Sequence, residues 1–417
     1  MNFARSRSQP ALSPVFWVLF WGTLVNRSAS FVGVFLGLHV TQDLGLSKST
    51  AGWIVGLWGI GSWLASPVAG VLTDRVGRRT TMLLGLVASG LSVLAIAFAS
   101  ELHLVFALAF VAGGAQQLYY PASNAAIADL VPPDDRPRAY GLVYWAVNAG
   151  FTIGYAVGGV VPSRYLWLLF VADAGTTLIF AALVAWRVPE TRPAGAAHEP
   201  VLAGLAKVAT DRVFMVFAGL HLAALVVFTQ FELALPLDMA AHDQGSRSLS
   251  WLMAFNCAGV VVLQPWLAPR LRRFDASRLL AASAVLFGLG YGLNALVPGL
   301  SRWLAGAGPG STLTWGFALY LAGAALWTVG EVVGFPVASA LVANLAPVTL
   351  RGRYQGAFSM VWGMAMGLSP ILGGQVLEHL GAPVLWAVCM GIGILAALGH
   401  LIAAPARRRR LAATTPE

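Results

Sequence analysis

Four charged residues stand inside long apolar runs of the chain, where a charge can do chemistry that a surface charge cannot. They are Arg27, Asp173, Glu232 and Glu331. A charge is costly in an apolar medium, so charges found there are usually functional. The same medium disfavours the ionised form of a carboxyl, which lets the group bind and release a proton. These residues are therefore candidates for proton coupling, and none sits in an arrangement typical of a catalytic nucleophile.

The two glutamates are the strongest of these candidates. Each precedes a proline, Pro336 after Glu331 and Pro236 after Glu232. Proline frees backbone groups and can kink a helix. We expect Glu331 to carry the coupling proton. We expect Glu232 to be a second proton site or the partner of a cationic ligand, unless it lies near the outer mouth of the protein.

For Arg27 and Asp173, the question is whether the two residues pair with each other or have separate roles. Arg27 stands between Asn26 and Ser28, too far from the end of its run to reach the headgroup region easily. We expect it to pair with an acid and so to help gate a site. Asp173 is a possible partner, although its run should belong to the outer scaffold and a structural role for Asp173 is the favoured interpretation.

The apolar runs that carry these charges have the length of membrane-spanning helices. Of the 417 residues, 58% are hydrophobic and only 10% are charged, whereas a soluble domain has roughly 25% charged residues. A helix needs about 20 apolar residues to span a bilayer, and runs of this length are too long for barrel strands. The expected spans are 15–40, 51–73, 81–100, 103–129, 139–163, 165–186, 213–238, 249–268, 279–298, 314–345, 353–378 and 381–404.

The basic residues fall mostly on one side of these twelve expected spans. Of the 26 Lys and Arg residues, the opposite side receives only Lys48, Arg164, Arg247 and Arg302. This asymmetry predicts that both termini and the basic loops are cytoplasmic, in the cell (inner) membrane. The net charge of +9 then reflects topology and attraction to membrane lipids, so no nucleic-acid partner is expected.

One longer polar stretch divides the chain into two halves. It has three prolines and mixed charges, and it follows the sixth expected span on the basic side. We interpret it as a cytoplasmic linker. The predicted organisation is a cytoplasmic N-terminus at 1–14, a six-helix bundle at 15–186, a linker at 187–212, a second bundle at 213–404 and a basic cytoplasmic tail at 405–417.

The two halves are related in sequence. The segment Pro121–Gly159 aligns on Pro336–Gly374 without a gap, and several prolines, arginines and glycines match. This indicates duplication, with six-helix halves related by an axis along the membrane normal. In this alignment Gln116, which cannot titrate, is the counterpart of Glu331.

The loop after the second expected span has a recognisable pattern. Residues 70–79 read GVLTDRVGRR, which resembles the signature of the major facilitator superfamily. The resemblance implies an all-α membrane protein with twelve transmembrane helices in two six-helix bundles. It also implies a cytoplasmic gate in which Asp74 acts on the start of the eleventh helix, near 351–354, and Arg78 pairs with Asp129. The predicted gate residues are Gly70, Asp74, Arg75, Gly77, Arg78, Arg79 and Asp129.

A second motif resembles one from the drug:proton antiporters of this family. It lies in the fifth expected span, where Tyr155 replaces the proline of the antiporter motif and Pro370 retains that proline in the second half. Glycines on one face let a neighbouring backbone approach, so helix packing is an alternative explanation. The residues of this motif are Asn148, Gly150, Gly154, Gly158 and Gly159.

The glutamate of the tenth expected span also fits this branch of the family. Gly330-Glu331 followed by Pro336 resembles the multidrug exporters, in which helices 1, 4, 7 and 10 line the cavity. Polar and aromatic side chains nearby could contact substrate, since aromatic faces accept flat cations without strict geometry. These cavity candidates are Gln116, Gln117, Tyr119, Tyr120 and Trp145.

The energy source is expected to be an ion gradient. Neither of the two lysines, Lys48 and Lys207, stands in a phosphate-binding loop. The cysteines Cys257 and Cys389 lie in separate apolar spans and make no metal cluster. We therefore expect a proton gradient as the driving force, without ATP, other cofactors or metal.

The combined prediction is a secondary active transporter that works by alternating access and is competent as a monomer. Its expected activity is proton-coupled export of drug-like or amphipathic small molecules. The first alternative is a proton-coupled symporter or uniporter that takes up a metabolite. A non-transporting membrane sensor or enzyme is the alternative from another class.

Overall fold

The computed structural model describes a chain of helices, without strands in its described part. Described are residues 12–30, 32–132, 136–158, 161, 165–192, 208–271, 273–299, 309–346 and 351–412. Within this part, the all-α fold class is confirmed, and ten helices are long and apolar enough to cross a membrane. The two other expected spans, 15–40 and 139–163, are also helical, but the first is interrupted.

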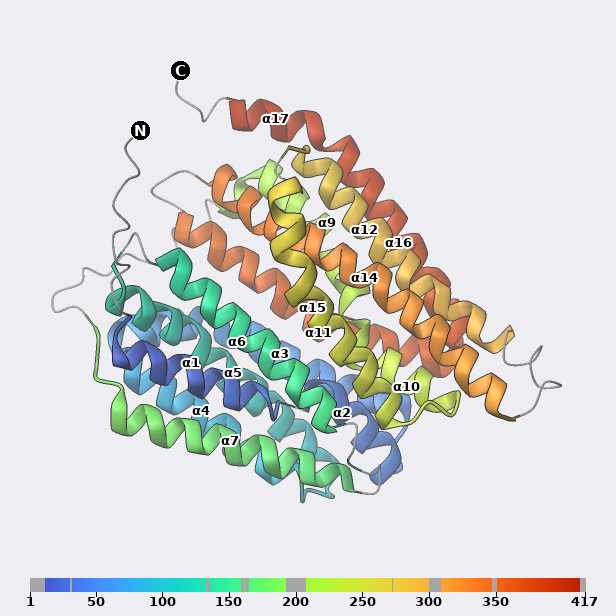
Figure 1. The fold of residues 1–417 in the computed structure, drawn as a ribbon, viewed down its shortest axis with the longest axis horizontal. Coiled ribbons are helices and arrows are strands. Elements are labelled where there is room, and N and C mark those ends of the chain that lie inside the picture. The colour runs from blue at the N-terminus through green and yellow to red at the C-terminus, as the bar shows by residue number, and fades with distance from the viewer. Residues whose placement is uncertain are drawn as a thin grey trace, which may run out of the picture.

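The helices form two consecutive groups. The N-terminal half contains α1 Pro14–Arg27, α2 Val32–Leu38, the π-helix η1 His39–Asp43, α3 Lys48–Arg75, α4 Arg78–Ile96, α5 Leu102–Leu130, α6 Arg136–Gly158 and α7 Leu166–Arg187. The C-terminal half contains α9 Arg212–Phe228, the 3-10 turn η4 Thr229–Glu232, α10 Ala234–Ala241, α11 Ser246–Leu271, α12 Ala276–Gly292, η5 Leu293–Leu296, α14 Pro309–Leu345, α15 Arg351–His379, α16 Ala382–Ile402 and α17 Ala404–Ala412. Figure 1 shows these groups, blue to green and yellow-green to red, on opposite sides of the molecule.

The first helix of each half is broken, which corrects two of the expected spans. The span expected at 15–40 stops after Arg27 and resumes in α2. The span expected at 213–238 breaks at Leu233, whose φ of −135° and ψ of −59° are not helical. The cause there is Pro236, because a proline ring clashes with the carbonyl four residues earlier, that of Glu232. The first break therefore follows the predicted site residue Arg27, and the second follows the predicted site residue Glu232.

The halves meet mainly along α3 and α15, with a second seam between α6 and α11. Glycines allow α3 and α15 to touch through their backbones: a Cβ added at Gly59 would lie 2.3 Å from the backbone nitrogen of Gly367. The contacts follow one antiparallel register, from Gly52 against Gly374 to Trp63 against Gly363. Close backbone approach of this kind is how helices associate in a membrane.

The predicted basic tail begins as a helix, α17. Arg407 on α17 is 2% exposed and donates to the hydroxyl of Ser277 at 3.2 Å, while Arg408 pairs with Asp275 at 3.1 Å. These bonds dock α17 on the start of α12. We call this end of the molecule, where α12 starts and the 70–79 loop lies, the basic end.

Candidate functional site

A cavity of about 670 Å³ lies between the two halves, and its walls come from both of them. All four charged residues singled out from the sequence line it, together with most of the predicted cavity residues. The predicted residues along this wall are Arg27, Gln116, Gln117, Tyr119, Tyr120, Asn148, Asp173, Glu232 and Glu331. A cavity of this size suits a drug-sized ligand.

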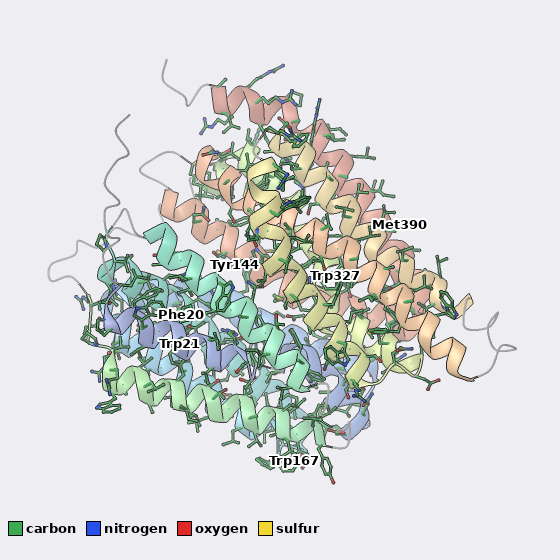
Figure 2. The ribbon with its side chains drawn as sticks, viewed as in Figure 1. Phe20, Trp21, Tyr144, Trp167, Trp327 and Met390 are labelled. Carbon is green, nitrogen blue, oxygen red and sulfur yellow. The ribbon has the colours of Figure 1, made fainter. Side chains whose placement is uncertain are left out.

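Trp145 does not line the cavity, which corrects that prediction. Its ring stacks on Phe20 of α1 at 6.3 Å and is 46% exposed on the outside of the protein. Tyr144, the preceding residue, lines the cavity instead, and Figure 2 labels it at the seam between the halves. The sequence pattern did not distinguish these neighbours, because adjacent residues of a helix point about 100° apart.

Glu331 is positioned by a neutral partner on the neighbouring helix. Its Oε2 accepts a hydrogen bond of 3.0 Å from the amide of Asn256 on α11, and the same amide lies 3.0 Å from the hydroxyl of Thr328. Asn256 was not predicted as a site residue. A polar residue in the apolar run at 249–268 was the signal that could have identified it. The arrangement holds the carboxyl in place without neutralising it.

Glu232 ends the short turn η4, immediately before the break in the seventh span. In the described part of the chain its carboxyl has no protein hydrogen-bonding partner and lies on the cavity wall. The break that Pro236 causes therefore places the carboxyl of Glu232 on the cavity wall. Discontinuous helices beside a midplane site recur in membrane transporters.

Arg27 ends α1 at the corresponding break in the other half. The guanidinium is 4% exposed, donates to the hydroxyl of Tyr120 at 2.6 Å and to that of Ser30 at 3.4 Å, and lies 5.6 Å from the centre of the Phe151 ring. The described bonds of Arg27 do not include a carboxylate, so the expected pairing with an acid is replaced here by hydroxyl partners.

Asp173 belongs to a chain of hydrogen bonds that ties α7 to α1. The hydroxyl of Thr177 lies 3.4 Å from its Oδ1, and Asn26 donates to the same hydroxyl at 2.7 Å. These bonds position the helix that carries Arg27. The arrangement is consistent with the structural role favoured for Asp173.

The glycines of the fifth-span motif face the break in α1. A Cβ at Gly150 would lie 2.6 Å from the Cβ of Arg27, and one at Gly154 would lie 2.8 Å from the carbonyl oxygen of Ser28. The motif therefore lets α6 pack on the segment that presents Arg27. Gly158 is the last residue of α6, and Gly159 lies outside the described residues.

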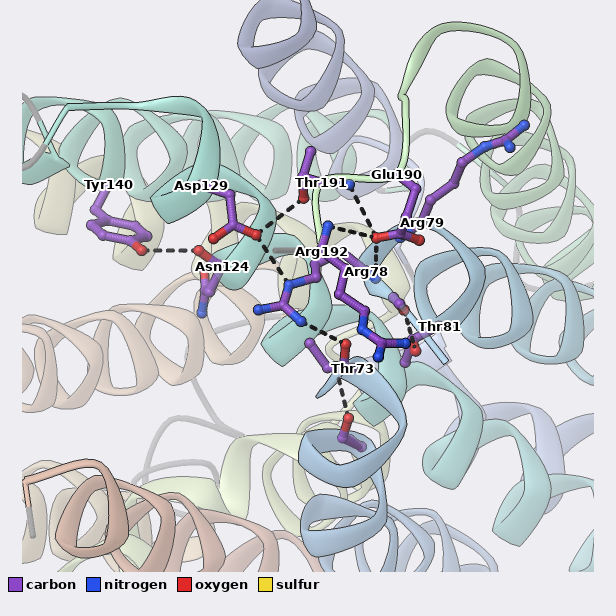
Figure 3. Close-up of polar contacts among 12 residues, drawn as sticks. Thr73, Arg78, Arg79, Thr81, Asn124, Asp129, Tyr140, Glu190, Thr191 and Arg192 are labelled. Carbon is purple, nitrogen blue, oxygen red and sulfur yellow. Dashed lines mark hydrogen bonds and ion pairs between the residues drawn. The ribbon is translucent and has the colours of Figure 1, made fainter. Parts of the chain in front are cut away.

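The ion pair expected in the 70–79 loop is present. Arg78 Nε lies 3.0 Å from Asp129 Oδ2, and Arg78 Nη1 donates to the carbonyl of Thr73 at 2.9 Å (Figure 3). The guanidinium thereby joins the end of α3 to the end of α5. The side chains of Asp74 and of residues 351–353, which the other half of the predicted gate needs, lie outside the described residues.

Glu190 completes this loop, and the sequence analysis missed it. Its Oε1 accepts from the backbone nitrogen of Arg78 at 2.8 Å, and its Oε2 accepts from that of Arg79 at 3.2 Å (Figure 3). The carboxylate caps α4, whose own N-cap, Gly77, has no side chain. The next residue, Thr191, donates to Asp129 at 3.2 Å. A lone acid directly after the sixth span was the available signal.

Two further arginines of this loop bond to the end of α7 and to the start of the linker. Arg79 donates to the carbonyl of Ala185, and the carbonyl of Arg75 accepts from Arg192. The first bond joins the 70–79 loop to the end of α7, and the second joins it to the segment after α7. The loop and the start of the linker therefore form one bonded unit at the basic end.

The halves are closed at the end opposite the basic end and separated at the basic end. At the closed end, the backbone nitrogen of Ser49 donates to Glu378, and Gln375 donates to the hydroxyl of Ser49. At the basic end, the α3–α15 register places Gly70 opposite Gly356, yet among the residues that the structure describes a Cβ at either would meet no atom within 4 Å. The cavity therefore opens toward the basic end.

The chain is similar along most of its length to bacterial membrane transporters. The uncharacterized MFS-type transporter YhjO of Bacillus subtilis is 26% identical over 91% of this chain and 90% of its own. The Na(+), Li(+), K(+)/H(+) antiporter of Planococcus maritimus is 24% identical, over 83% and 85%. The multidrug resistance protein MdtH of Edwardsiella ictaluri is 27% identical, over 82% and 75%.

Solved structures agree on the fold. The peptide transporter POT in complex with sulfate superposes with a TM-score of 0.77 at 16% identity, covering 95% of each chain. The nucleoside transporter NupG also gives 0.77, at 15% identity, covering 94% of this chain and 99% of its own. The family model of the Major Facilitator Superfamily matches residues 18–239 and 231–417. The chain is therefore a member of the major facilitator superfamily, a multi-pass membrane transporter of small molecules rather than an enzyme.

Proposed function

We propose that this transporter exports a drug-like or amphipathic small molecule from the cytoplasm in exchange for protons, with Glu331 as the proton carrier. The observation that supports this most directly is the hydrogen bond of 3.0 Å from Asn256 to Glu331 on the cavity wall. A neutral amide fixes the carboxyl without an opposing cation, so protonation breaks no ion pair. The carboxyl can therefore alternate between proton and substrate.

The basic end is cytoplasmic in this proposal, as the distribution of Lys and Arg predicts. The conformation described above is then inward-facing, with the outer end closed by Ser49, Gln375 and Glu378. Alternating access requires these contacts to break while α3 and α15 close at Gly70 and Gly356. The Arg78–Asp129 pair and the Glu190 cap lie at the end that must close.

The names of two relatives support the exchange of protons and the export of drugs. One is called an antiporter of monovalent cations and protons, and another a multidrug resistance protein. The proton gradient is sufficient without ATP. One proton moving through about 100 mV releases roughly 2.3 kcal/mol, and each pH unit adds about 1.4 kcal/mol. Together they sustain a substrate gradient of several hundred-fold.

The test uses inside-out vesicles with an acid interior, reported by the quenching of a fluorescent base. Lipophilic cations, neutral drugs and metabolites are added one at a time. We expect particular compounds to release protons and dequench the dye with wild type but not with Glu331→Gln. The matched control is Glu101→Gln, because Glu101 is exposed and has no side-chain capping bond on α5. Dequenching that persists in Glu331→Gln would refute the assignment of the proton site.

Uptake of a metabolite by proton symport is the competing function. It draws support from Tyr155, which stands where the antiporter motif has proline. If metabolites instead increase quenching or enter right-side-out vesicles with protons, export is wrong and symport is right. A response to neither group of compounds would count against proton-coupled export and make facilitated diffusion the next function to test, by an uptake assay.

A further inference from the structure

The charges in the cavity are divided between its two walls. The N-terminal half contributes Arg27 at the end of α1, and the C-terminal half contributes Glu232 from η4 and Glu331 from α14. A ligand between the walls therefore faces a cation on one side and carboxyls on the other.

Arg27 has the properties of an anion-binding residue, because its described partners are all neutral. The guanidinium has five N–H donors, and its two described hydrogen bonds go to the neutral hydroxyls of Tyr120 and Ser30. Its ring neighbours, Tyr120 and Phe151, carry no charge. Asp173 also lines the cavity, but its described bond goes to Thr177. A buried cation held by neutral groups leaves much of its desolvation cost uncompensated, and an incoming carboxylate would compensate it.

Glu232 is the complementary residue on the opposite wall. In the described part of the chain, its carboxyl makes no hydrogen bond to the protein, whereas the carboxyl of Glu331 accepts a hydrogen bond from the amide of Asn256. Of the two carboxyls, Glu232 is thus the one free to receive a donor from the ligand. Glu331 remains available for the proton.

Aromatic side chains from both halves line the cavity together with these charged residues. Phe151 and Tyr155 of α6 line the cavity from one half, and Phe231, Phe335 and Trp362 line it from the other. Phe335 packs edge-on against Trp362 at 5.0 Å. Aromatic walls in a cavity of about 670 Å³ suit a flat, drug-sized body.

We propose that the substrate is amphoteric: an anionic group binds Arg27, a protonated amine binds Glu232, and a planar apolar body lies between them. This rests on the proposed function, because it treats the cavity as the transport site. A substrate with only a cation would leave Arg27 unpaired beside a like charge. That mismatch would select against it, since specificity often comes from unpaired charges in the wrong complex.

The test compares two dyes that differ in one ester. Rhodamine 110 carries a free carboxylate and a cationic ring system, and rhodamine 123 is its methyl ester. Binding to the purified full-length protein in nanodiscs is measured by fluorescence polarisation, without any gradient. We expect wild type to bind rhodamine 110 about tenfold more tightly than rhodamine 123, the effect of one charged hydrogen-bonded pair.

Variants assign this preference to the proposed residues. Arg27→Gln should weaken rhodamine 110 binding about tenfold and leave rhodamine 123 unchanged or tighter, whereas Arg27→Lys should retain part of the preference. Glu232→Gln should weaken both dyes. The matched control is Arg247→Gln, because Arg247 is exposed at the start of α11 and lies outside the cavity.

Several outcomes would overturn the proposal. They are equal affinity for the two dyes in wild type, tighter binding of the ester, or no binding of rhodamine 110. An unchanged preference in Arg27→Gln, shown to be folded by its thermal unfolding, would also overturn it. Because binding is measured without a proton gradient, failure of proton coupling in vesicles would leave this result separately interpretable.

Discussion

At the scale of single residues, the site depends on neutral groups that hold charged ones. Asn256 holds Glu331, the hydroxyls of Tyr120 and Ser30 hold Arg27, and Thr177 contacts Asp173. Neutral partners position Glu331 and Arg27 without cancelling their charges, so these two charges stay available for a proton or a ligand. A hydrogen bond to a charged group contributes about 1.5–3 kcal/mol, enough to fix a side chain in one rotamer.

Asn256→Ala removes the group that positions Glu331. We expect proton-driven transport to fall about tenfold, because a carboxyl that rotates freely meets proton and substrate less often in a productive geometry. Transport is measured in the vesicle assay described above. Ser250→Ala on the same helix is the control, since Ser250 is buried outside the cavity lining. Full activity of Asn256→Ala would show that this hydrogen bond has no part in coupling.

Glu190→Ala removes the carboxylate that caps α4. We expect the free energy of unfolding to fall by about 0.5–2 kcal/mol, the usual cost of a lost N-cap. The measurement is the thermal unfolding midpoint of the purified protein. Glu101→Ala gives the comparison, because Glu101 is the N-cap of α5 and its side chain makes no capping bond. An equal loss in both variants would mean that charge alone, and not the cap, is responsible.

At the scale of helices, both interrupted spans place a charged residue at the break. Arg27 ends α1 and Glu232 ends η4, in the first helix of each half. The close approach of Gly150 and Gly154 to residues 27 and 28 shows how α6 supports one break. The other break follows from Pro236. The fifth-span motif is thus a packing surface for the segment that presents Arg27.

Gly150→Ala should disturb this packing. Its added Cβ would lie 2.6 Å from the Cβ of Arg27, so α6 or the end of α1 has to move. We expect loss of rhodamine 110 binding and of transport. Gly141→Ala is the matched control on the same helix, because no described atom lies within 4 Å of its added Cβ, and alanine favours the helix by about 0.5–1 kcal/mol. Equal activity of the two variants would contradict the proposed role of the motif.

Much of the helical arrangement could be predicted from hydrophobic run length and the sidedness of basic residues. The breaks were harder to predict, because Asn26 to Ser28 differ little from polar residues that stay helical, and Pro236 could equally have produced a kink. The facing direction of single side chains also escaped prediction, as Trp145 and Tyr144 show. Glu190 was missed because a capping acid depends on where the chain returns after α7, which only the tertiary structure fixes.

At the scale of the whole molecule, the halves touch at the end opposite the basic end and, in the described part of the chain, are separated at the basic end. Cysteine pairs test this directly in a protein whose buried Cys257 and Cys389 are replaced by alanine. Ser49→Cys with Gln375→Cys should cross-link rapidly under mild oxidation and block transport until reduced. Gly70→Cys with Gly356→Cys should cross-link slowly at rest and faster during turnover. Equal rates for the two pairs at rest would contradict the inward-facing assignment.

We propose that alternating access is a rotation of the halves about the glycine contacts of α3 and α15. The cavity charges come from both halves, so a ligand that joins Arg27 to the opposite wall would draw the halves together. Proton binding at Glu331 would favour the return. In symport the substrate and the proton would instead cross in the same movement, so the direction of coupling has to be measured.

The most direct test of the central claim compares uphill transport with exchange in proteoliposomes that contain wild type or Glu331→Gln. Uphill transport is accumulation of a substrate driven by a pH gradient, and exchange is its swap for labelled substrate without a gradient. We expect Glu331→Gln to lose accumulation and retain exchange, because the cavity persists while the proton site is gone. Undiminished accumulation by Glu331→Gln would contradict the claim that Glu331 carries the coupling proton.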